Sequence, residues 1–170
     1  MTEPSPQHRR LILMRHAKSA WDDPALTDHA RPLNARGRRS AEALGAWLRR
    51  RGYRPDEALV SDAQRTRDTF AGLALPMTAR FEPRLYHAEP PQLLARLREA
   101  EAPCVLLIAH NPGIGHFAAS LLGRRPQHPR FADYPTGATL VADFPITAWH
   151  QLDPGTGQPL DFIVPRDLTD

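Results

Sequence analysis

The sequence predicts an α/β fold with a mostly parallel central sheet, because short apolar runs alternate with helical patterns along most of the chain. Residues 10–15 and 104–109 have the length and apolar content of buried strands. Each run is followed directly by a histidine, His16 or His110. Ligands of open α/β sheets bind where strands end, so the same two runs predict a functional site.

The predicted elements follow in order from apolar periodicity and from helix-capping residues. Strands are expected at residues 10–15, 58–60, 76–81, 104–109 and 137–144, and helices at 35–51, 63–73, 91–100 and 113–122. Asn34 is a suitable N-cap for the first helix, and Gly52 is a suitable residue to end it. Ser61 and Asp62 are expected to cap the second helix.

Turn residues define the segments between these elements. Residues 16–33 form a long loop with turn signals, and loops of this length in small domains are often functional. Residues 82–91 are expected to form an irregular connection, and the Pro- and Arg-rich residues 124–135 a loop. Residues 149–152 and 160–164 are expected to form a terminal hairpin around a Pro- and Gly-containing turn.

Length and composition suit a globular domain. We expect a single domain over residues 10–170, after a flexible leader at residues 1–9. No apolar run approaches the ~20 residues that a membrane span requires. The polar start of the chain lacks the apolar centre of a signal peptide, so we expect a cytoplasmic location and no membrane partner. Cys104 is the only cysteine, which excludes an internal disulfide and a cysteine-based metal cluster.

The chain is weakly basic, with a formal net charge of +3, and Lys18 is its only lysine. Nucleic-acid binding combines a basic stripe with aromatic platforms. Aromatic residues make up only 7% of the chain and do not interleave with the arginines. We therefore expect no nucleic-acid partner and attribute the arginine content to compositional bias.

The pair Arg15-His16 suggests a nucleophile for phosphoryl transfer. An adjacent arginine lowers the pKa of an imidazole, because two cations repel each other, and this leaves a ring nitrogen free to attack phosphorus. Arginine also binds phosphate oxygens through two parallel hydrogen bonds. Taken alone, His16 has an equally ordinary interpretation as a structural histidine held by hydrogen bonds.

Three further residues complete a predicted phosphate pocket. Arg65 lies in the first turn of a predicted helix, where a cation is unfavourable unless an anion shares the site. Arg67 is expected to be solvated. Arg31 precedes a proline in the long loop, and His110 lies between a strand and a helix start. The alternatives are a surface charge for Arg31 and a helix-capping role for His110.

Four ordered segments carry a resemblance to a known family. They are residues 13–19 (LMRHAKS), 31–33 (RPL), 61–69 (SDAQRTRDT) and 109–112 (AHNP). On these segments the chain resembles the histidine phosphatase, phosphoglycerate-mutase-like superfamily, and within it the short SixA-like phosphohistidine phosphatases, over roughly residues 10–165. The usual Arg-His-Gly signature is Arg15-His16-Ala17 here. The resemblance implies a three-layer α/β/α fold.

The resemblance also implies a mechanism. His16 is the nucleophile that becomes phosphorylated, Arg15, Arg65 and His110 clamp the phosphoryl group, and Arg31 contacts a further phosphate oxygen. Water then hydrolyses the intermediate. Lys18 and Ser19 follow the nucleophile and either touch substrate or shape the loop. The arginines supply the charge that phosphoryl transfer needs, so we expect neither a metal nor a cofactor.

The general acid is the open part of this mechanism. Glu89 and Asp28 are the two candidates, although either can be an ordinary exposed loop carboxylate. An alkoxide leaving group needs a proton in the transition state. A phosphorylated imidazole departs readily once its ring is protonated, so an enzyme that cleaves P–N bonds can work without a strong acid.

The leading functional hypothesis is a phosphatase acting on phosphohistidine, with a phosphohistidine-bearing phosphorelay protein as a candidate partner. The short chain supports this, since it leaves little room for a lid over the site. One alternative is a small-molecule phosphomonoesterase of the same superfamily. Another, of a different class, is a non-catalytic phosphate-binding module. The sequence does not determine the physiological substrate or the oligomeric state.

Overall fold

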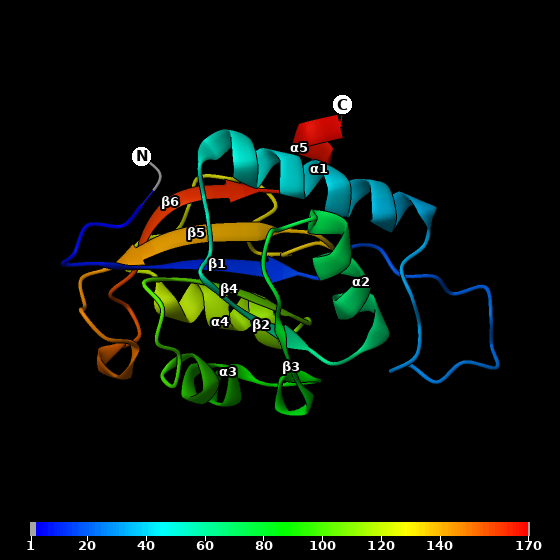
Figure 1. The fold of residues 1–170 in the computed structure, drawn as a ribbon, viewed down its shortest axis with the longest axis horizontal. Coiled ribbons are helices and arrows are strands. Elements are labelled where there is room, and N and C mark those ends of the chain that lie inside the picture. The colour runs from blue at the N-terminus through cyan, green and yellow to red at the C-terminus, as the bar shows by residue number, and fades with distance from the viewer. Residues whose placement is uncertain (1–2, 170) are drawn as a thin grey trace.

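A six-stranded sheet in the order β3-β2-β4-β1-β5-β6 forms the centre of the protein (Figure 1). The structure is a computed structural model that describes residues 3–169. The strands are β1 (Arg9–Arg15), β2 (Glu57–Ser61), β3 (Arg80–Glu82), β4 (Cys104–Ala109), β5 (Thr139–Phe144) and β6 (Gln158–Ile163). The first four run parallel, whereas β5 is antiparallel to β1 and β6 is antiparallel to β5. The predicted mostly parallel sheet is confirmed.

Helices cover both faces of this sheet, which gives the predicted three layers (Figure 1). The helices are α1 (Ala35–Arg51), α2 (Gln64–Leu73), α3 (Pro90–Leu97), α4 (Gly113–Leu121) and the short α5 (Arg166–Thr169). Side chains of α1 and α2 pack on one face, and those of α3 and α4 pack on the other. Short 3₁₀ turns, η1 (Pro83–Leu85) and η2 (Trp149–Gln151), complete the connections.

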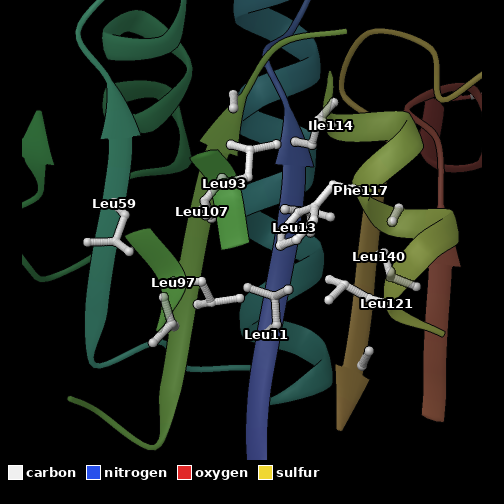
Figure 2. Close-up of a cluster of buried hydrophobic side chains, with 14 of the residues drawn as sticks. Leu11, Leu13, Leu59, Leu93, Leu97, Leu107, Ile114, Phe117, Leu121 and Leu140 are labelled. Carbon is white, nitrogen blue, oxygen red and sulfur yellow. The ribbon is translucent and has the colours of Figure 1, made fainter. Parts of the chain in front are cut away.

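The central strands are largely apolar because both of their faces are buried. In β1, Leu11 and Leu13 join the cluster under α3 and α4, whereas Ile12 and Met14 join the cluster under α1 and α2. This alternation follows from the two-residue period of a strand. Figure 2 shows the first cluster, in which Leu13 of β1 and Phe117 of α4 lie close together. In β1 the buried Arg10 near the start of the strand pairs with Asp143 of β5 at 2.8 Å. His16 and His110 directly follow the ends of β1 and β4.

Local signals define both ends of α1. The Asn34 side chain accepts a hydrogen bond of 2.8 Å from the Gly37 backbone N–H, as an N-cap does. Gly52 has a left-handed conformation with φ of 73°, which glycine adopts without steric cost, and ends the helix. Both predicted caps are confirmed. The arginines at 49–51 lie in the last turn, where cations complement the helix dipole.

The connections place a crevice between the carboxyl ends of β1 and β4. The helix that follows β1 covers one face of the sheet, and the helix that follows β4 covers the other. Such a reversal between neighbouring parallel strands is where open α/β sheets bind ligands. Arg15 is paired with Ala109 in the β1–β4 register. His16 and His110, one residue further along each strand, therefore emerge side by side.

Two strand predictions in the periphery were wrong. In the segment 149–152, Trp149–Gln151 form a 3₁₀ turn rather than a strand, and β6 pairs with β5 instead. Trp149 is buried and its indole N–H donates to the Ala102 carbonyl at 2.7 Å, so this segment serves as a core anchor and not as a sheet edge. The third strand begins at Arg80, later than predicted.

The single domain over residues 10–170 and the leader at residues 1–9 remain predictions. Residues 1–2 of that leader, and residue 170, lie outside the described part of the chain, and Arg9 already belongs to β1. In the described part, no helix is long and apolar enough to cross a membrane.

We expect Leu107→Ala to lower the free energy of unfolding by about 2–5 kcal/mol, since it leaves a cavity in a fully buried central strand. Urea denaturation of the two proteins measures the difference. Leu160→Ala on β6 is the matched control, because Leu160 is 38% exposed and its truncation should cost less than about 1 kcal/mol. Equal losses for the two variants would contradict the assignment of β4 to the core.

Candidate active site

His16 is presented in one tautomer. Its Nδ1 lies 2.6 Å from the Ala17 carbonyl oxygen. A carbonyl only accepts hydrogen bonds, so Nδ1 carries the ring proton and Nε2 keeps its lone pair. Burial, together with the charges of Arg15, Arg65 and Arg31, lowers the pKa of His16 to about 3 against the opposing effect of the Ala17 hydrogen bond. Nε2 is thus an unprotonated nucleophile at neutral pH.

The ring borders a polar cavity of about 480 Å³ at the end of the sheet. Most of its lining side chains are basic or are hydrogen-bond donors. The complete lining consists of Arg15, His16, Lys18, Ser19, Trp21, Asp28, Arg31, Arg65, His87, His110, Asn111 and Thr136. Segments from β1, the long loop, α2, the residues before α3, and β4 therefore meet at one place.

Asp28 connects the two arginines that come from outside β1. One of its carboxylate oxygens accepts from Arg31 at 2.8 Å, and the other accepts from Arg65 at 3.1 Å. Arg65 also donates to the Asp28 backbone carbonyl at 2.7 Å. Arg31 donates to Ser19 Oγ at 2.7 Å, and its guanidinium stacks on Trp21 at 3.6 Å from the ring centroid. Both guanidinium groups are thereby held in defined orientations.

His110 faces His16 across the cavity, with ring centroids 5.3 Å apart. Its Nε2 lies 2.8 Å from Ser61 Oγ, at the end of β2. Burial, followed by the charges of nearby groups, lowers the pKa of His110 far below its ordinary value. Ser61 and Asp62 were predicted to cap α2, and this was wrong: Ala63 is at the N-cap position without a side-chain cap hydrogen bond, and the Ser61 hydroxyl orients His110 instead.

Several buried nitrogens in the site have no hydrogen-bond partner among the described residues. They are the Nε atoms of Arg15, Arg31 and Arg65 and the Nδ1 atom of His110. Buried polar groups of native proteins are normally satisfied, so such a concentration requires an explanation. Guanidinium groups bind phosphate oxygens strongly. Burial, and then the charge of Arg65, lowers the pKa of Arg15, and an anion bound between the guanidinium groups would offset their mutual repulsion.

Asp28 is an ionised group in this arrangement. Hydrogen bonds from Tyr86 and Arg31, and then from Arg65, hold the pKa of its carboxyl far below the ordinary range. The Tyr86 hydroxyl donates to it at 2.5 Å, and His87 Nε2 lies 3.4 Å from the same oxygen. A carboxylate in this state orients its partners and carries no proton to donate at neutral pH.

The structure brings eight of the nine predicted site residues together in the cavity lining. They are Arg15, His16, Lys18, Ser19, Asp28, Arg31, Arg65 and His110. Glu89 lies apart from this lining: it is exposed, and its backbone N–H donates to the Gln92 side chain at the start of α3. Among residues 3–169, no group of three His, Cys, Asp or Glu side chains is placed to hold a metal ion.

Sequence reasoning missed several lining residues. Asn111 accompanies His110 in a motif segment, and its amide donates to the Tyr134 carbonyl at 2.9 Å, which fixes the loop before β5. Thr136 carried no signal. His87 and Trp21 lie in segments that were predicted to be irregular, where an aromatic ring is the only local hint. Their place in the site depends on contacts with Asp28 and Arg31.

Comparison with known proteins identifies the family. The model of the histidine phosphatase superfamily (branch 1) matches residues 11–101. The chain belongs to this superfamily. Rv1276c of Mycobacterium tuberculosis is 32% identical over 160 residues, which cover 90% of this chain and all of that protein. The resemblance drawn from the four sequence segments is confirmed.

Solved structures place this histidine phosphatase beside the SixA proteins. A structure from Nakamurella multipartitia, assigned as a phosphohistidine phosphatase SixA, matches with a TM-score of 0.80 and 28% identity over 92% of this chain and 95% of that one. A corresponding protein from Agrobacterium tumefaciens matches with a TM-score of 0.76 and 27% identity over 92% and 97% of the two chains. The SixA-like branch and its α/β fold are thereby shown.

The lowered pKa of His16 predicts that its Nε2 stays unprotonated as the pH falls from 8 to 5 in the phosphate-free protein. Imidazole ¹⁵N chemical shifts measure this, with free histidine as an internal reference. Below the ordinary pKa of 6.5 the unfolded chain takes up a proton that the folded protein does not. The free energy of unfolding should therefore decrease as the pH falls from 6.5 towards 3. A His16 transition near pH 6.5 would contradict this environment.

The ionised state of Asp28 predicts how Asp28→Asn affects turnover. If Asp28 only orients the arginines, the variant changes kcat/KM by the same factor for substrates with good and with poor leaving groups. Aryl phosphates that differ in phenol pKa provide the comparison, measured at one pH and ionic strength. A loss that grows steeply with leaving-group pKa would instead show that Asp28 delivers a proton.

Proposed function

We propose that this histidine phosphatase hydrolyses phosphohistidine through a covalent intermediate on His16, without a metal. The observation that carries the proposal is the unprotonated Nε2 of a buried histidine whose cavity is lined by three arginines. The proposal places the reaction in the cytoplasm. The name of the Nakamurella protein, at 28% identity, points to the same substrate class.

In the first step, the Nε2 lone pair of His16 forms a bond to phosphorus as the P–N bond of the substrate breaks. The electron pair of that bond passes to the departing imidazole. When the substrate ring carries a proton on its other nitrogen, it leaves as neutral imidazole and needs no acid from the protein. Arg15, Arg31 and Arg65 neutralise the charge on the transferring oxygens, and His110 offers a further nitrogen.

In the second step, water attacks phosphorus and the bond to Nε2 breaks. Phosphorylated His16 is already cationic, since Nδ1 keeps its proton on the Ala17 carbonyl at 2.6 Å. The ring therefore departs from phosphorus as the neutral tautomer that began the cycle. The attacking water loses a proton to phosphate or to solvent, and inorganic phosphate is released.

The carboxylates of the site favour a P–N substrate over an ester. Asp28 has a strongly lowered pKa and is committed to two arginines, and Glu89 lies outside the cavity lining. An ester with a poor leaving group needs a proton donor in the transition state, whose contribution is typically about 10²–10⁴-fold. Phosphohistidine needs no proton donor from the protein for its leaving group. It is therefore the substrate that fits these side chains best.

The proposal predicts that a peptide carrying ³²P-labelled phosphohistidine transfers its label to His16. Acid quenching is excluded because phosphohistidine is acid-labile, so the intermediate is trapped by rapid alkaline quenching and located by mass spectrometry. His16→Ala should lose label and lower turnover by at least about 10³-fold, because no other nucleophile replaces the ring. Arg65→Ala should retain the site of labelling while turnover falls by about 10²–10³-fold.

Substrate preference completes this test. The wild-type protein should show a higher kcat/KM for the phosphohistidine peptide than for sugar phosphates with alkoxide leaving groups, with p-nitrophenyl phosphate between them. Glu89→Gln is the matched control, since it removes a carboxylate outside the cavity and should leave all three values unchanged. Preference for a sugar phosphate, or full turnover by His16→Ala, would overturn the proposal.

A further inference from the structure

A second cavity of about 170 Å³ lies beside the active-site cavity, and Lys18 and Thr136 line both of them. Among residues 3–169, its lining includes four basic side chains, Lys18, Arg36, Arg130 and Arg166, and no acidic one. We call it the basic cavity. Its position makes it a neighbour of the phosphoryl site, separated from it by the Lys18–Thr136 wall.

Backbone hydrogen bonds hold the wall between the two cavities on both sides. The Asn34 backbone N–H donates to the Lys18 carbonyl at 3.0 Å. A Cβ on Gly37 would lie 2.0 Å from the same oxygen, so only glycine permits this close approach of α1 to the loop. On the other side, the Gly137 N–H donates to the His16 carbonyl at 2.9 Å. These contacts tie one side of the wall to the start of α1 and the other side to His16.

The charges around the basic cavity favour an anion. Arg36 lies in the first turn of α1, a turn that contains no acidic residue. A cation at the positive end of a 17-residue helix is unfavourable unless an anion shares the site. Arg130 pairs with Asp133 at 3.1 Å, but both side chains are about half exposed, and such pairs contribute little. An incoming carboxylate can therefore compete for Arg130.

We propose that the basic cavity binds an aspartate or glutamate side chain of the phosphorylated protein substrate, close to its phosphohistidine. This inference rests on the proposed function. An anion in the basic cavity is separated by the wall from the phosphoryl group on its way to His16, so the substrate must carry it as a second group. A polypeptide supplies such a carboxylate at a defined spacing, and guanidinium groups bind carboxylates through paired hydrogen bonds.

The test compares two phosphohistidine peptides that differ only in charge. One carries glutamate on both sides of the phosphohistidine, and the other carries glutamine at those positions. The ratio of their kcat/KM values measures the contribution of the basic cavity and cancels any general loss of activity. We expect a ratio of about 10 for the wild-type protein at low salt, decreasing as salt screens the charges.

Arg36→Gln combined with Arg166→Gln should reduce this ratio to about 1–2, because two of the four cations are removed. Arg50→Gln is the matched control, since Arg50 is exposed in the last turn of the same helix, about 21 Å from Arg36 along the axis. It removes one positive charge, as Arg36→Gln does by itself, and should leave the ratio unchanged. Circular dichroism confirms that each variant is folded.

The outcomes separate this inference from the proposed function. One outcome is that both peptides label His16 and yet have equal kcat/KM values with the wild-type protein. In that case the basic cavity does not bind acidic residues of the substrate, and this inference is wrong while the proposed function stands. A ratio that survives in the double variant, or falls equally in Arg50→Gln, overturns it as well. If neither peptide labels His16, the proposed function fails and the inference falls with it.

Discussion

The pairing of β1 with β4 is the constraint on which the rest of the site depends. Alternate side chains of these strands pack into two different buried clusters, so a shift of one residue would exchange the side chains between the clusters and disrupt the packing of both. The register that pairs Arg15 with Ala109 is therefore strongly specified. It delivers His16 and His110 to one edge with ring centroids 5.3 Å apart, and the remaining groups are arranged around them.

Burial at this edge converts an ordinary imidazole into a directed nucleophile. The Ala17 carbonyl selects the tautomer, and desolvation together with three guanidinium charges keeps Nε2 unprotonated. The same charges repel one another, and only Asp28 among the lining residues carries a compensating negative charge. Repulsion between the guanidinium groups thus lowers the stability of the folded protein at this site, and the same charges raise its affinity for an anion. Such a loss of stability is common at functional sites.

The long loop after β1 is irregular but firmly anchored. Ser19 and Leu33 form an isolated antiparallel bridge, and the Ala20 N–H donates to the Pro32 carbonyl at 2.8 Å. These contacts fix the two ends of the loop, while Asp28 ties its tip to Arg65 on α2. The loop therefore holds Arg31 over the active-site cavity and Lys18 between that cavity and the basic cavity.

The sequence by itself determined the alternation of strands and helices, the caps of α1, the family, and the histidines and arginines of the cavity. These features depend on local periodicity, capping chemistry and short motifs. Only the tertiary structure decided that Asp28 rather than Glu89 enters the cavity, that Ser61 orients His110, that Trp149 anchors the core, and that a basic cavity adjoins the site. Each of these depends on contacts between residues far apart in the chain, and such contacts leave no local pattern to interpret.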